Sequence, residues 1–319
     1  MSCNKFISSH SHQLNIKNRI STLIFQSVFF YKSILFQKFY STALKFRYLH
    51  MLNLLKKSLN FYIKSSIHVA LAVLSLAKIS LFSAGLDPQY ALLIFIFFSA
   101  LSAYNFIKFS PLFKSQKLSF SPALISLLTL TAFIISGTVI FLLPSLVAAF
   151  AIFGGFLVLG YTVPFLSTLS NWRSKKGWKL YLVVLSWLCL TVGVPLASAE
   201  LFDAGLFFKL ALVQGIYIFV AILPFEIGDL NVDAAALQTL PQTLGVKRVK
   251  FLGVLLLLSG SLIAIMSFGF SSPFVKSSLI TFLILGLCLW RSKENQSPLF
   301  TRFWVEGIPI LWYILIYYF

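Results

Sequence analysis

The chain is 319 residues long, and 59% of its residues are hydrophobic whereas only 11% are charged. Because an ordinary soluble domain carries about 25% charged residues, this composition excludes a typical soluble globular protein and predicts a polytopic membrane protein. The formal net charge of +18 does not call for a nucleic acid partner, since anionic lipid and positively charged inner loops account for it.

Residues 1–60 form a basic extension without a long apolar core, and no Asp or Glu occurs before Asp87. Two interpretations remain open. The segment is either an extension without a structural role, with Met51 opening the stretch that leads into the first span, or a targeting peptide. A targeting peptide would be an organellar transit peptide or a signal peptide with "STLIFQSVFF" as a weak core. We expect residues 1–50 to be poorly ordered and dispensable, and residues 61–319 to form the membrane domain.

Nine apolar segments follow, each about long enough to cross roughly 30 Å of hydrocarbon as a helix. They predict an all-α fold, a polytopic membrane protein with about nine transmembrane helices. Their approximate limits are 64–85, 89–108, 122–143, 145–165, 178–199, 205–226, 250–270, 274–290 and 303–319.

Lysine and arginine concentrate in every second connection between these segments. Because positively charged loops stay on the cytoplasmic side, we expect those connections to face the cytoplasm and the C-terminus to lie outside. The membrane is then the inner membrane, or an organellar membrane if residues 1–60 are a transit peptide. The basic residues are Lys108, Lys114, Lys117, Arg173, Lys175, Lys176, Lys179, Lys247, Arg248, Lys250, Arg291, Lys293 and Arg302.

The stretch "PFEIGDLNVD" at the end of the sixth segment contains three of the eight acidic residues in the chain. Glu226, Asp229 and Asp233 are spaced i, i+3 and i+7, so on a continuous helix they would share one face. Pro224 is expected to loosen the end of this helix. Converging carboxylates need a counter-charge, which is either water with the nearby basic residues or a divalent cation. Mg²⁺ fits the second case, because it is typically held by one or two carboxylates together with substrate phosphates.

The segment "GDLNVDAAALQTLPQTLGVKRVK", residues 228–250, resembles the second aspartate motif of the UbiA superfamily of intramembrane prenyltransferases. In that motif a D-x-x-x-D after the sixth helix precedes a threonine and a Leu-Gly pair. The matching residues are Asp229, Asp233, Thr239, Leu244 and Gly245. The resemblance implies a fold of nine helices around a central cavity, which agrees with the number of apolar segments.

A second likeness lies between the fourth and fifth segments. There "GYTVPF", residues 160–165, followed by Arg173, is similar to the family's Tyr-Pro and basic loop.

The family's first motif, Asn-x-x-x-Asp-x-x-x-Asp after the second helix, falls on "YNFIKFSPLF". Asn105 is kept, but Phe109 and Phe113 occupy the two aspartate positions, and Pro111 is expected to disrupt the helix there. Phenylalanine cannot bind a metal. We therefore expect one Mg²⁺ per diphosphate, with Lys108 supplying part of the missing positive charge.

The resemblance implies a Mg²⁺-dependent membrane enzyme. It would transfer an isoprenyl group from an allylic diphosphate to a lipophilic acceptor, such as an aromatic precursor of a quinone. Asp229 and Asp233 would hold the Mg²⁺, and Glu226 would add a ligand or support them. The expected substrate-binding residues are Asn105, Lys108, Tyr161, Arg173 and Lys247; each basic residue among them can equally be an ordinary charge of an inner loop.

Two other functions remain open from the sequence. One is a catalytically degenerate relative that binds isoprenoid phosphates, and the other is a transporter that uses the carboxylates as an ion site. A transporter usually places its acidic residues near the middle of the membrane. Here they lie at one edge beside basic loops, which favours phosphate chemistry.

Overall fold

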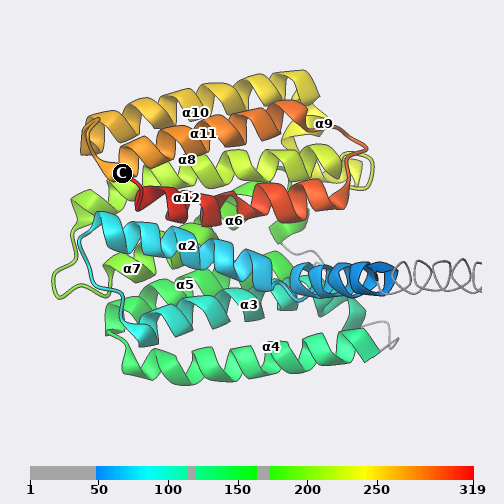
Figure 1. The fold of residues 1–319 in the computed structure, drawn as a ribbon, viewed down its shortest axis with the longest axis horizontal. Coiled ribbons are helices and arrows are strands. Elements are labelled where there is room, and N and C mark those ends of the chain that lie inside the picture. The colour runs from blue at the N-terminus through cyan, green and yellow to red at the C-terminus, as the bar shows by residue number, and fades with distance from the viewer. Residues whose placement is uncertain (1–47, 114–119, 164–171) are drawn as a thin grey trace, which may run out of the picture. The chain divides into compact units, whose positions relative to one another are not determined.

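The computed structural model describes residues 48–113, 120–163 and 172–319. The described residues are helical or lie in short connections, and they include no β-strand (Figure 1). Contacts within the chain divide it into two units, Met1–Phe61 and Tyr62–Phe319. The expectation that residues 1–50 are poorly ordered falls almost entirely outside the described residues.

The predicted all-α membrane fold is confirmed for the second unit. In the described part of this unit, nine apolar helical segments occur near the predicted positions. They are α2 (Ile67–Ser83), α3 (Tyr90–Phe113), α4 (Phe120–Val139) with η1 (Ile140–Leu142), α5 (Ser145–Thr162), α6 (Trp178–Leu188) with η3 (Cys189–Gly193) and α7 (Val194–Leu196), α8 (Ala204–Gly228), α10 (Val246–Phe268), α11 (Pro273–Arg291), and η5 (Phe300–Val305) with α12 (Glu306–Ile316).

By length and apolarity, seven helices of the described chain can cross a membrane, or eight if Tyr48–Lys64 and Ile67–Ser83 together form one broken span. The chain is therefore an integral membrane protein. Short helices lie in two of the connections: η2 (Trp172–Ser174) precedes α6, while η4 (Ala235–Leu237) and α9 (Leu240–Leu244) lie between α8 and α10.

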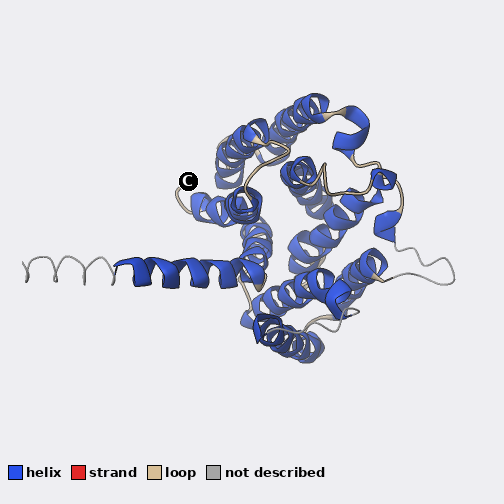
Figure 2. Cartoon of the chain, turned by 90° about the vertical axis from the view of Figure 1, so that its right-hand side faces the viewer, coloured by secondary structure: helices blue, strands red, loops and turns tan. Residues whose placement is uncertain are grey.

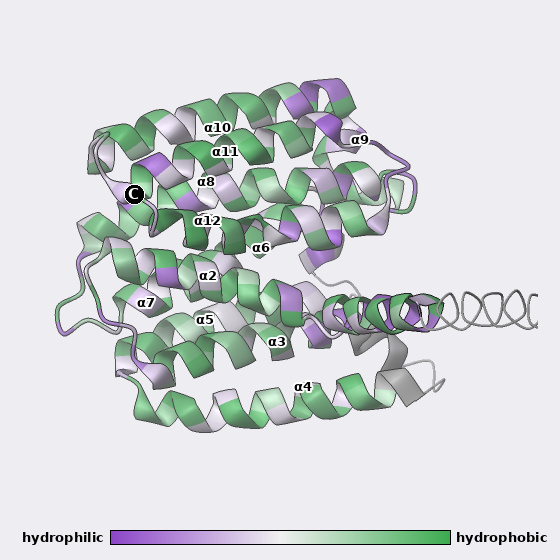
Figure 3. Ribbon diagram, in the orientation of Figure 1, coloured by the Kyte–Doolittle hydropathy of each residue, from purple (hydrophilic) through white to green (hydrophobic). Residues whose placement is uncertain are grey.

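The helices of the second unit run side by side, as the view onto their ends shows (Figure 2). We call the end at which α3, α5, α8 and α11 finish the basic end, because the described lysine and arginine residues of the predicted cytoplasmic loops, such as Lys108, Arg173 and Lys247, lie at it. It is on the right in Figure 1, beside α9. Apolar residues cover the helices along their length, and hydrophilic residues gather at this end (Figure 3).

Close helix packing at α10 depends on glycine. A Cβ atom on Gly260 would come within 2.9 Å of the Phe282 ring, and one on Gly253 would collide with Leu289. Helix association in lipid lacks a strong hydrophobic drive, so small residues that let backbones approach are a main source of packing energy. The glycines of α10 therefore fix this helix against α8 and α11.

Two helices contain π-helical turns, Cys189–Gly193 in the fifth span and Phe300–Val305 in the ninth. The first turn precedes Pro195, which has no N–H to donate to the preceding turn, so a local change of hydrogen bonding is expected there. By contrast, α3 continues through Pro111 to Phe113, so the predicted disruption at Pro111 is wrong for the backbone.

Candidate functional site

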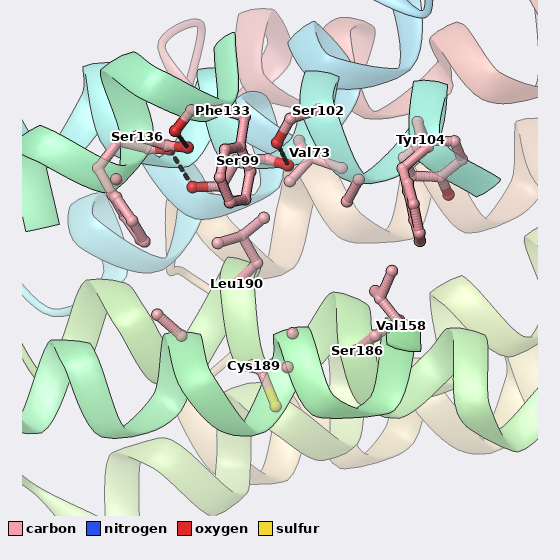
Figure 4. Close-up of a pocket in the computed structure, with 18 of the residues that line it drawn as sticks. Val73, Ser99, Ser102, Tyr104, Phe133, Ser136, Val158, Ser186, Cys189 and Leu190 are labelled. Carbon is pink, nitrogen blue, oxygen red and sulfur yellow. Dashed lines mark hydrogen bonds between the residues drawn. The ribbon is translucent and has the colours of Figure 1, made fainter. Parts of the chain in front are cut away.

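An apolar groove of about 900 Å³ lies between α3, α4, α5 and the α6–η3 segment (Figure 4). Aromatic and aliphatic side chains form most of its wall, for example Phe95 of α3, Leu130 of α4 and Leu190 of η3. A volume of this size is within the usual range for a site that holds a small organic ligand.

Most serine and threonine hydroxyl groups in the groove wall are bonded to backbone. Five of the six donate a hydrogen bond to a carbonyl about one turn earlier in the same helix, and Figure 4 shows those of Ser102 and Ser136. The groups are Ser99, Ser102, Thr129, Ser136 and Ser186. Because these hydroxyl protons are already used, the groove presents an effectively apolar surface to a ligand.

The groove opens sideways between α4 and α5. Four of its lining residues on these helices are strongly exposed: Leu130 (57%), Phe133 (67%), Ile152 (69%) and Phe156 (44%). In a helix that crosses a membrane, exposed residues of this kind face lipid tails. A hydrophobic ligand can therefore enter the groove from the membrane.

The end of the groove nearest the basic end is polar. The Trp187 indole N–H donates a hydrogen bond of 2.5 Å to the Tyr104 hydroxyl, and Tyr104 also interacts electrostatically with Tyr161 of α5 and Glu306 of α12. Asn105 is fully buried, and its amide nitrogen and oxygen both lack a hydrogen-bond partner among the described residues.

The acidic segment, residues 226–233, begins in α8 and leaves the helix at Asp229, which is its C-cap. The N–H groups of Val232 and Asp233 both bond to the Asp229 carbonyl, at 2.9 and 2.8 Å, and close a turn. The prediction that Glu226, Asp229 and Asp233 share one face of a continuous helix is therefore wrong. Glycine at 228 followed by Asp-Leu-Asn-Val-Asp is a poor helix sequence, which explains why the helix stops.

The three carboxylates accordingly have different surroundings. Asp229 is exposed. Asp233 forms an ion pair with Lys179, with 2.7 Å between Nζ and Oδ2, and a longer one of 4.0 Å with Arg173. Glu226 is only 2% exposed, and its Oε2 has no hydrogen-bond partner in the described chain.

A small cavity of about 80 Å³ adjoins Glu226, with Lys179 and Thr239 also in its wall. The backbone N–H of Leu240 hydrogen-bonds to the Glu226 carboxyl group. The Gln242 side chain holds the connecting turn in place, since its amide donates to the Asp233 carbonyl at 3.1 Å. This cavity therefore contains one free carboxylate oxygen beside an ammonium group.

The basic loop before α6 packs onto the acidic segment. The Gly177 N–H donates to the Leu237 carbonyl at 3.0 Å, and the Arg173 guanidinium lies over the Tyr161 ring at 5.4 Å from its centroid. Two loops that are 50 or more residues apart in the sequence thus form one surface of alternating charge at the basic end.

The structure therefore brings Tyr161, Arg173, Asp233 and Glu226 together. The remaining predicted residues are placed differently. The Lys108 ammonium donates to the carbonyls of Ile63 and Lys64 and to the Ser66 hydroxyl, at 3.0 to 3.4 Å.

Asn105 lies one turn before Lys108 in α3, and Lys247 is exposed near the start of α10.

Two residues of this region were missed by the sequence interpretation. Lys179 was counted only as a loop charge, and its ion pair with Asp233 depends on a contact between distant loops. Glu306 carried a usable signal, because it is the one acidic residue in the last apolar segment, and an ionisable residue within a membrane span is a functional candidate.

The donor groups at the basic end fit a divalent cation only if a ligand completes its coordination. Among the described residues, no three His, Cys, Asp or Glu side chains lie together as a ready metal site. However, the exposed Asp229 carboxylate and the free Glu226 Oε2 are hard oxygen donors of the kind that Mg²⁺ prefers. Phosphate oxygens and water would have to supply the rest of the coordination shell.

Comparison with known proteins yields one solved structure. The chain is similar to a UbiA homologue from Archaeoglobus fulgidus, with a TM-score of 0.42 and 14% sequence identity, over 81% of this chain and 94% of that chain. No protein-family model and no curated protein matches.

Proposed function

We propose that this chain is a membrane prenyltransferase of the UbiA superfamily. It transfers an isoprenyl group from an allylic diphosphate to a lipophilic acceptor, with an aromatic quinone precursor as the preferred class, and it needs Mg²⁺. The observation that carries the proposal is the continuity of two surfaces. An apolar groove open to lipid ends at Tyr104, Tyr104 interacts with Tyr161, and the Arg173 guanidinium of the basic end lies over the Tyr161 ring. An isoprenyl diphosphate likewise consists of an apolar chain joined to a charged group.

The groove supports the apolar half of this substrate. Its exposed α4 and α5 residues allow a chain to enter from the membrane, and most of its serine and threonine hydroxyl groups are already bonded to backbone. A hydrocarbon chain that fills the groove therefore breaks few hydrogen bonds of the wall, and its binding depends on shape rather than on polar contacts.

The basic end supports the diphosphate half. Arg173 and Lys179 balance Asp233 in the structure, so both cations stand beside the place where a diphosphate would bind. Lys247 adds charge at the same end. Arg173 can bind two phosphate oxygens through its planar guanidinium group, whereas Lys179 acts as a point charge.

Asp229 and Asp233 are the residues that would hold Mg²⁺, with Glu226 close by. When bound, the cation neutralises charge that develops on the departing diphosphate. For Asp233 to take part, its ion pair with Lys179 must open, which leaves the Lys179 ammonium free for a phosphate oxygen. The residues thus exchange partners when substrate binds.

The reaction breaks the bond between the allylic carbon and the diphosphate oxygen, and the electron pair leaves with the diphosphate. An electron pair of the acceptor then bonds to the allylic carbon, and the acceptor loses a proton. Tyr104 and Trp187, whose rings lie 6.1 Å apart at the polar end of the groove, offer electron-rich faces to the allylic cation, as does Tyr161.

The test is to incubate the purified full chain with Mg²⁺, allylic diphosphates of increasing length and a lipid extract, and to look for prenylated products by mass spectrometry. We expect a product that depends on both Mg²⁺ and the diphosphate. Tight diphosphate binding without any product would instead identify a degenerate binding protein. Ion movement across vesicles that is independent of diphosphate would identify a transporter.

A further inference from the structure

The helix Tyr48–Lys64 precedes α2, and the chain turns between the two helices at Ser66, which has a positive φ of 63°. At 100° per residue, the polar side chains of this helix, Ser58 excepted, fall within a sector of about 120°, and Leu49 is the one apolar residue among them. They are His50, Asn53, Lys56, Lys57, Asn60 and Lys64. No Asp or Glu occurs before Asp87, so the helix has one basic side without acidic residues.

The opposite side of this helix is apolar. Apart from Ser58, the residues on the remaining arc are large and apolar or aromatic: Tyr48, Met51, Leu52, Leu54, Leu55, Leu59, Phe61, Tyr62 and Ile63. Several of them are exposed in the described part of the chain, for example Met51 (50%) and Leu55 (59%). A broad apolar side opposite a lysine-containing polar side is the pattern of helices that lie in the interface between lipid and water.

Lys108 of α3 holds the last turn of this helix at the basic end of the bundle. Its ammonium group donates hydrogen bonds to the carbonyls of Ile63 and Lys64, at 3.4 and 3.0 Å. The final carbonyls of a helix have no partner within the helix, and a positive charge beside them is favourable. The end of the helix is therefore capped by a residue of the second span.

His68 of α2 holds the same turn through a second contact. The Tyr62 hydroxyl lies 2.9 Å from Nδ1 of His68, and the Phe303 carbonyl lies 2.9 Å from Nε2. Because a carbonyl only accepts, Nε2 carries a proton, and in the neutral ring Nδ1 then accepts from the tyrosine hydroxyl. The helix end is thus fixed where the first and the last spans begin, which is the level of the membrane surface.

We propose that the helix Tyr48–Lys64 lies in the headgroup layer of the bilayer that the bundle crosses, and that its lysines bind anionic phospholipids. The apolar side rests on the acyl chains, and the basic side faces phosphates and water. The positive charges are attracted to an anionic leaflet. Because the bundle keeps the helix end at this surface, the helix needs no high affinity of its own. The inference does not depend on the proposed function.

A position of this helix inside the hydrocarbon does not fit its charges. The basic sector would then face lipid tails, where lysine is costly. A position in water does not fit either, since the apolar side would stay exposed. The interface satisfies both sides at once.

The experiment attaches a spin label to Leu55→Cys or to Lys57→Cys in the full chain, with Cys3, Cys189 and Cys288 replaced by alanine. The protein is placed in bilayers of phosphatidylcholine with phosphatidylglycerol. Oxygen, which concentrates in lipid, and a neutral nickel chelate, which stays in water, are the two relaxing reagents. We expect oxygen to reach the label of Leu55→Cys and nickel that of Lys57→Cys, because these positions are about 160° apart around the helix.

Three results would overturn the proposal. Nickel access at both positions would place the helix in water, and oxygen access at both would place it across the bilayer. Shielding of the Leu55→Cys label from both reagents would mean that protein covers the apolar side, either from this chain or from a second copy.

The charge of the basic side is tested by combining Lys56→Gln, Lys57→Gln and Lys64→Gln with the label at Leu55→Cys. Without these three substitutions, phosphatidylglycerol should lower the nickel access of the label relative to phosphatidylcholine alone. Each lysine near an anionic surface favours binding by about fivefold, so the triple variant should lose most of this dependence on lipid charge.

The matched control combines Lys175→Gln, Lys176→Gln and Lys293→Gln with the same label. These lysines are exposed at the same end of the bundle but lie outside the helix, so the dependence on lipid charge should persist. Equal behaviour of the two triple variants, or no dependence on lipid charge when all six lysines are present, would show that the helix does not bind anionic lipid.

Discussion

The two halves of the membrane bundle differ in how closely their helices pack. Around α8, α10, α11 and α12, large side chains such as Trp312, Tyr217 and Phe274 are fully buried. In the half that contains α4 and α5, 17% of the apolar window of each of these helices is buried, against 39% in α8 and 44% in α11, while the outer helix α10 reaches 22%. The groove occupies this looser half.

The difference indicates a division of work. The dense half holds α8 in place, so the acidic segment that follows α8 starts from a fixed position. In the proposed function, the loose half leaves volume for an isoprenyl chain that enters from lipid and that can differ in length. The Asp233–Lys179 ion pair joins the two, because Lys179 begins α6 beside the groove and Asp233 follows α8.

The largest effect is expected from Asp229→Asn, which removes a proposed cation ligand without disturbing either of the ion pairs found among the described residues. Loss of a direct carboxylate ligand should weaken Mg²⁺-dependent diphosphate binding by at least about 100-fold, because even supporting residues around a metal contribute 10- to 100-fold. Binding of a labelled diphosphate by the purified variant measures this. An unchanged affinity would mean that Asp229 is only a helix cap.

Asp233→Asn should differ from Asp229→Asn in one respect. Lys179 is only 13% exposed, and it would lose its partner, so this variant should also unfold more readily. Breaking a buried ion pair from one side costs about 3–5 kcal/mol. Because this pair is partly exposed, we expect the free energy of unfolding to fall by about 3 kcal/mol or less. Thermal unfolding of both variants separates the two effects.

The next prediction concerns the volume of the groove. Gly155 lies in its wall, and a Cβ at this position would meet no atom within 4 Å. Gly155→Trp should therefore fill the groove and shift the preference toward shorter allylic diphosphates by about tenfold, which is the discrimination typical of an apolar pocket. The ratios of kcat/KM across a chain-length series measure the shift.

Leu262→Trp is the matched control for this prediction. Leu262 is 62% exposed on α10, in the dense half and away from the groove. The added volume should project into lipid and leave the chain-length preference as it is. An equal shift in both variants would show that the groove does not hold the isoprenyl chain.

Packing in the two halves can be compared with one kind of substitution. Gly253→Ala puts a methyl group against Leu289 in the dense half, whereas Gly155→Ala adds one to open space. The first should lower the free energy of unfolding by about 1–3 kcal/mol, the usual cost of overpacking. The second should change it little, or stabilise the helix slightly because alanine is the better helix former.

Unfolding curves in detergent with added denaturant provide this comparison. Equal destabilisation by both alanines would mean that the two halves pack alike, which would remove the contrast between them.

The sequence predicted the order of the nine apolar helical segments, because a membrane requires apolar helices of similar length and leaves charges at their ends. Of the described helices, seven or eight are long and apolar enough to cross a membrane. The sequence also located the acidic segment, since carboxylates are rare in this chain. It could not predict the groove. Phenylalanine and leucine are equally common on surfaces that face lipid, a cavity or a neighbouring helix, so composition does not tell these surfaces apart.

The partners of the charged residues were equally out of reach. The spacing of Glu226, Asp229 and Asp233 suggested one helical face, but the helix ends at Gly228. Lys179 finds Asp233 through a contact between residues 54 positions apart. The local sequence pattern contains no information about such distant pairs. Glu306, by contrast, could be recognised from the sequence as an acidic residue inside an apolar segment.

The smallest effect is expected from Lys108→Ala. The sequence suggested that this lysine replaces a lost cation. In that case Lys108→Ala should weaken diphosphate binding more than Lys293→Ala, which removes a charge from the same end of the bundle. In the structure the ammonium group donates to two carbonyls and one hydroxyl between residues 63 and 66. Its phosphate role therefore competes with an anchoring role.

We expect Lys108→Ala to weaken diphosphate binding by less than about tenfold, that is by less than about 1.4 kcal/mol, while Lys293→Ala changes nothing measurable. The exposed ammonium can be replaced by water at the carbonyls, so the free energy of unfolding should fall by only about 0.5–1.5 kcal/mol. A loss of binding well above tenfold with unchanged stability would show that Lys108 leaves its carbonyls when diphosphate arrives. In that case the ammonium would act on the leaving group directly, and the loose half of the bundle would supply charge as well as volume.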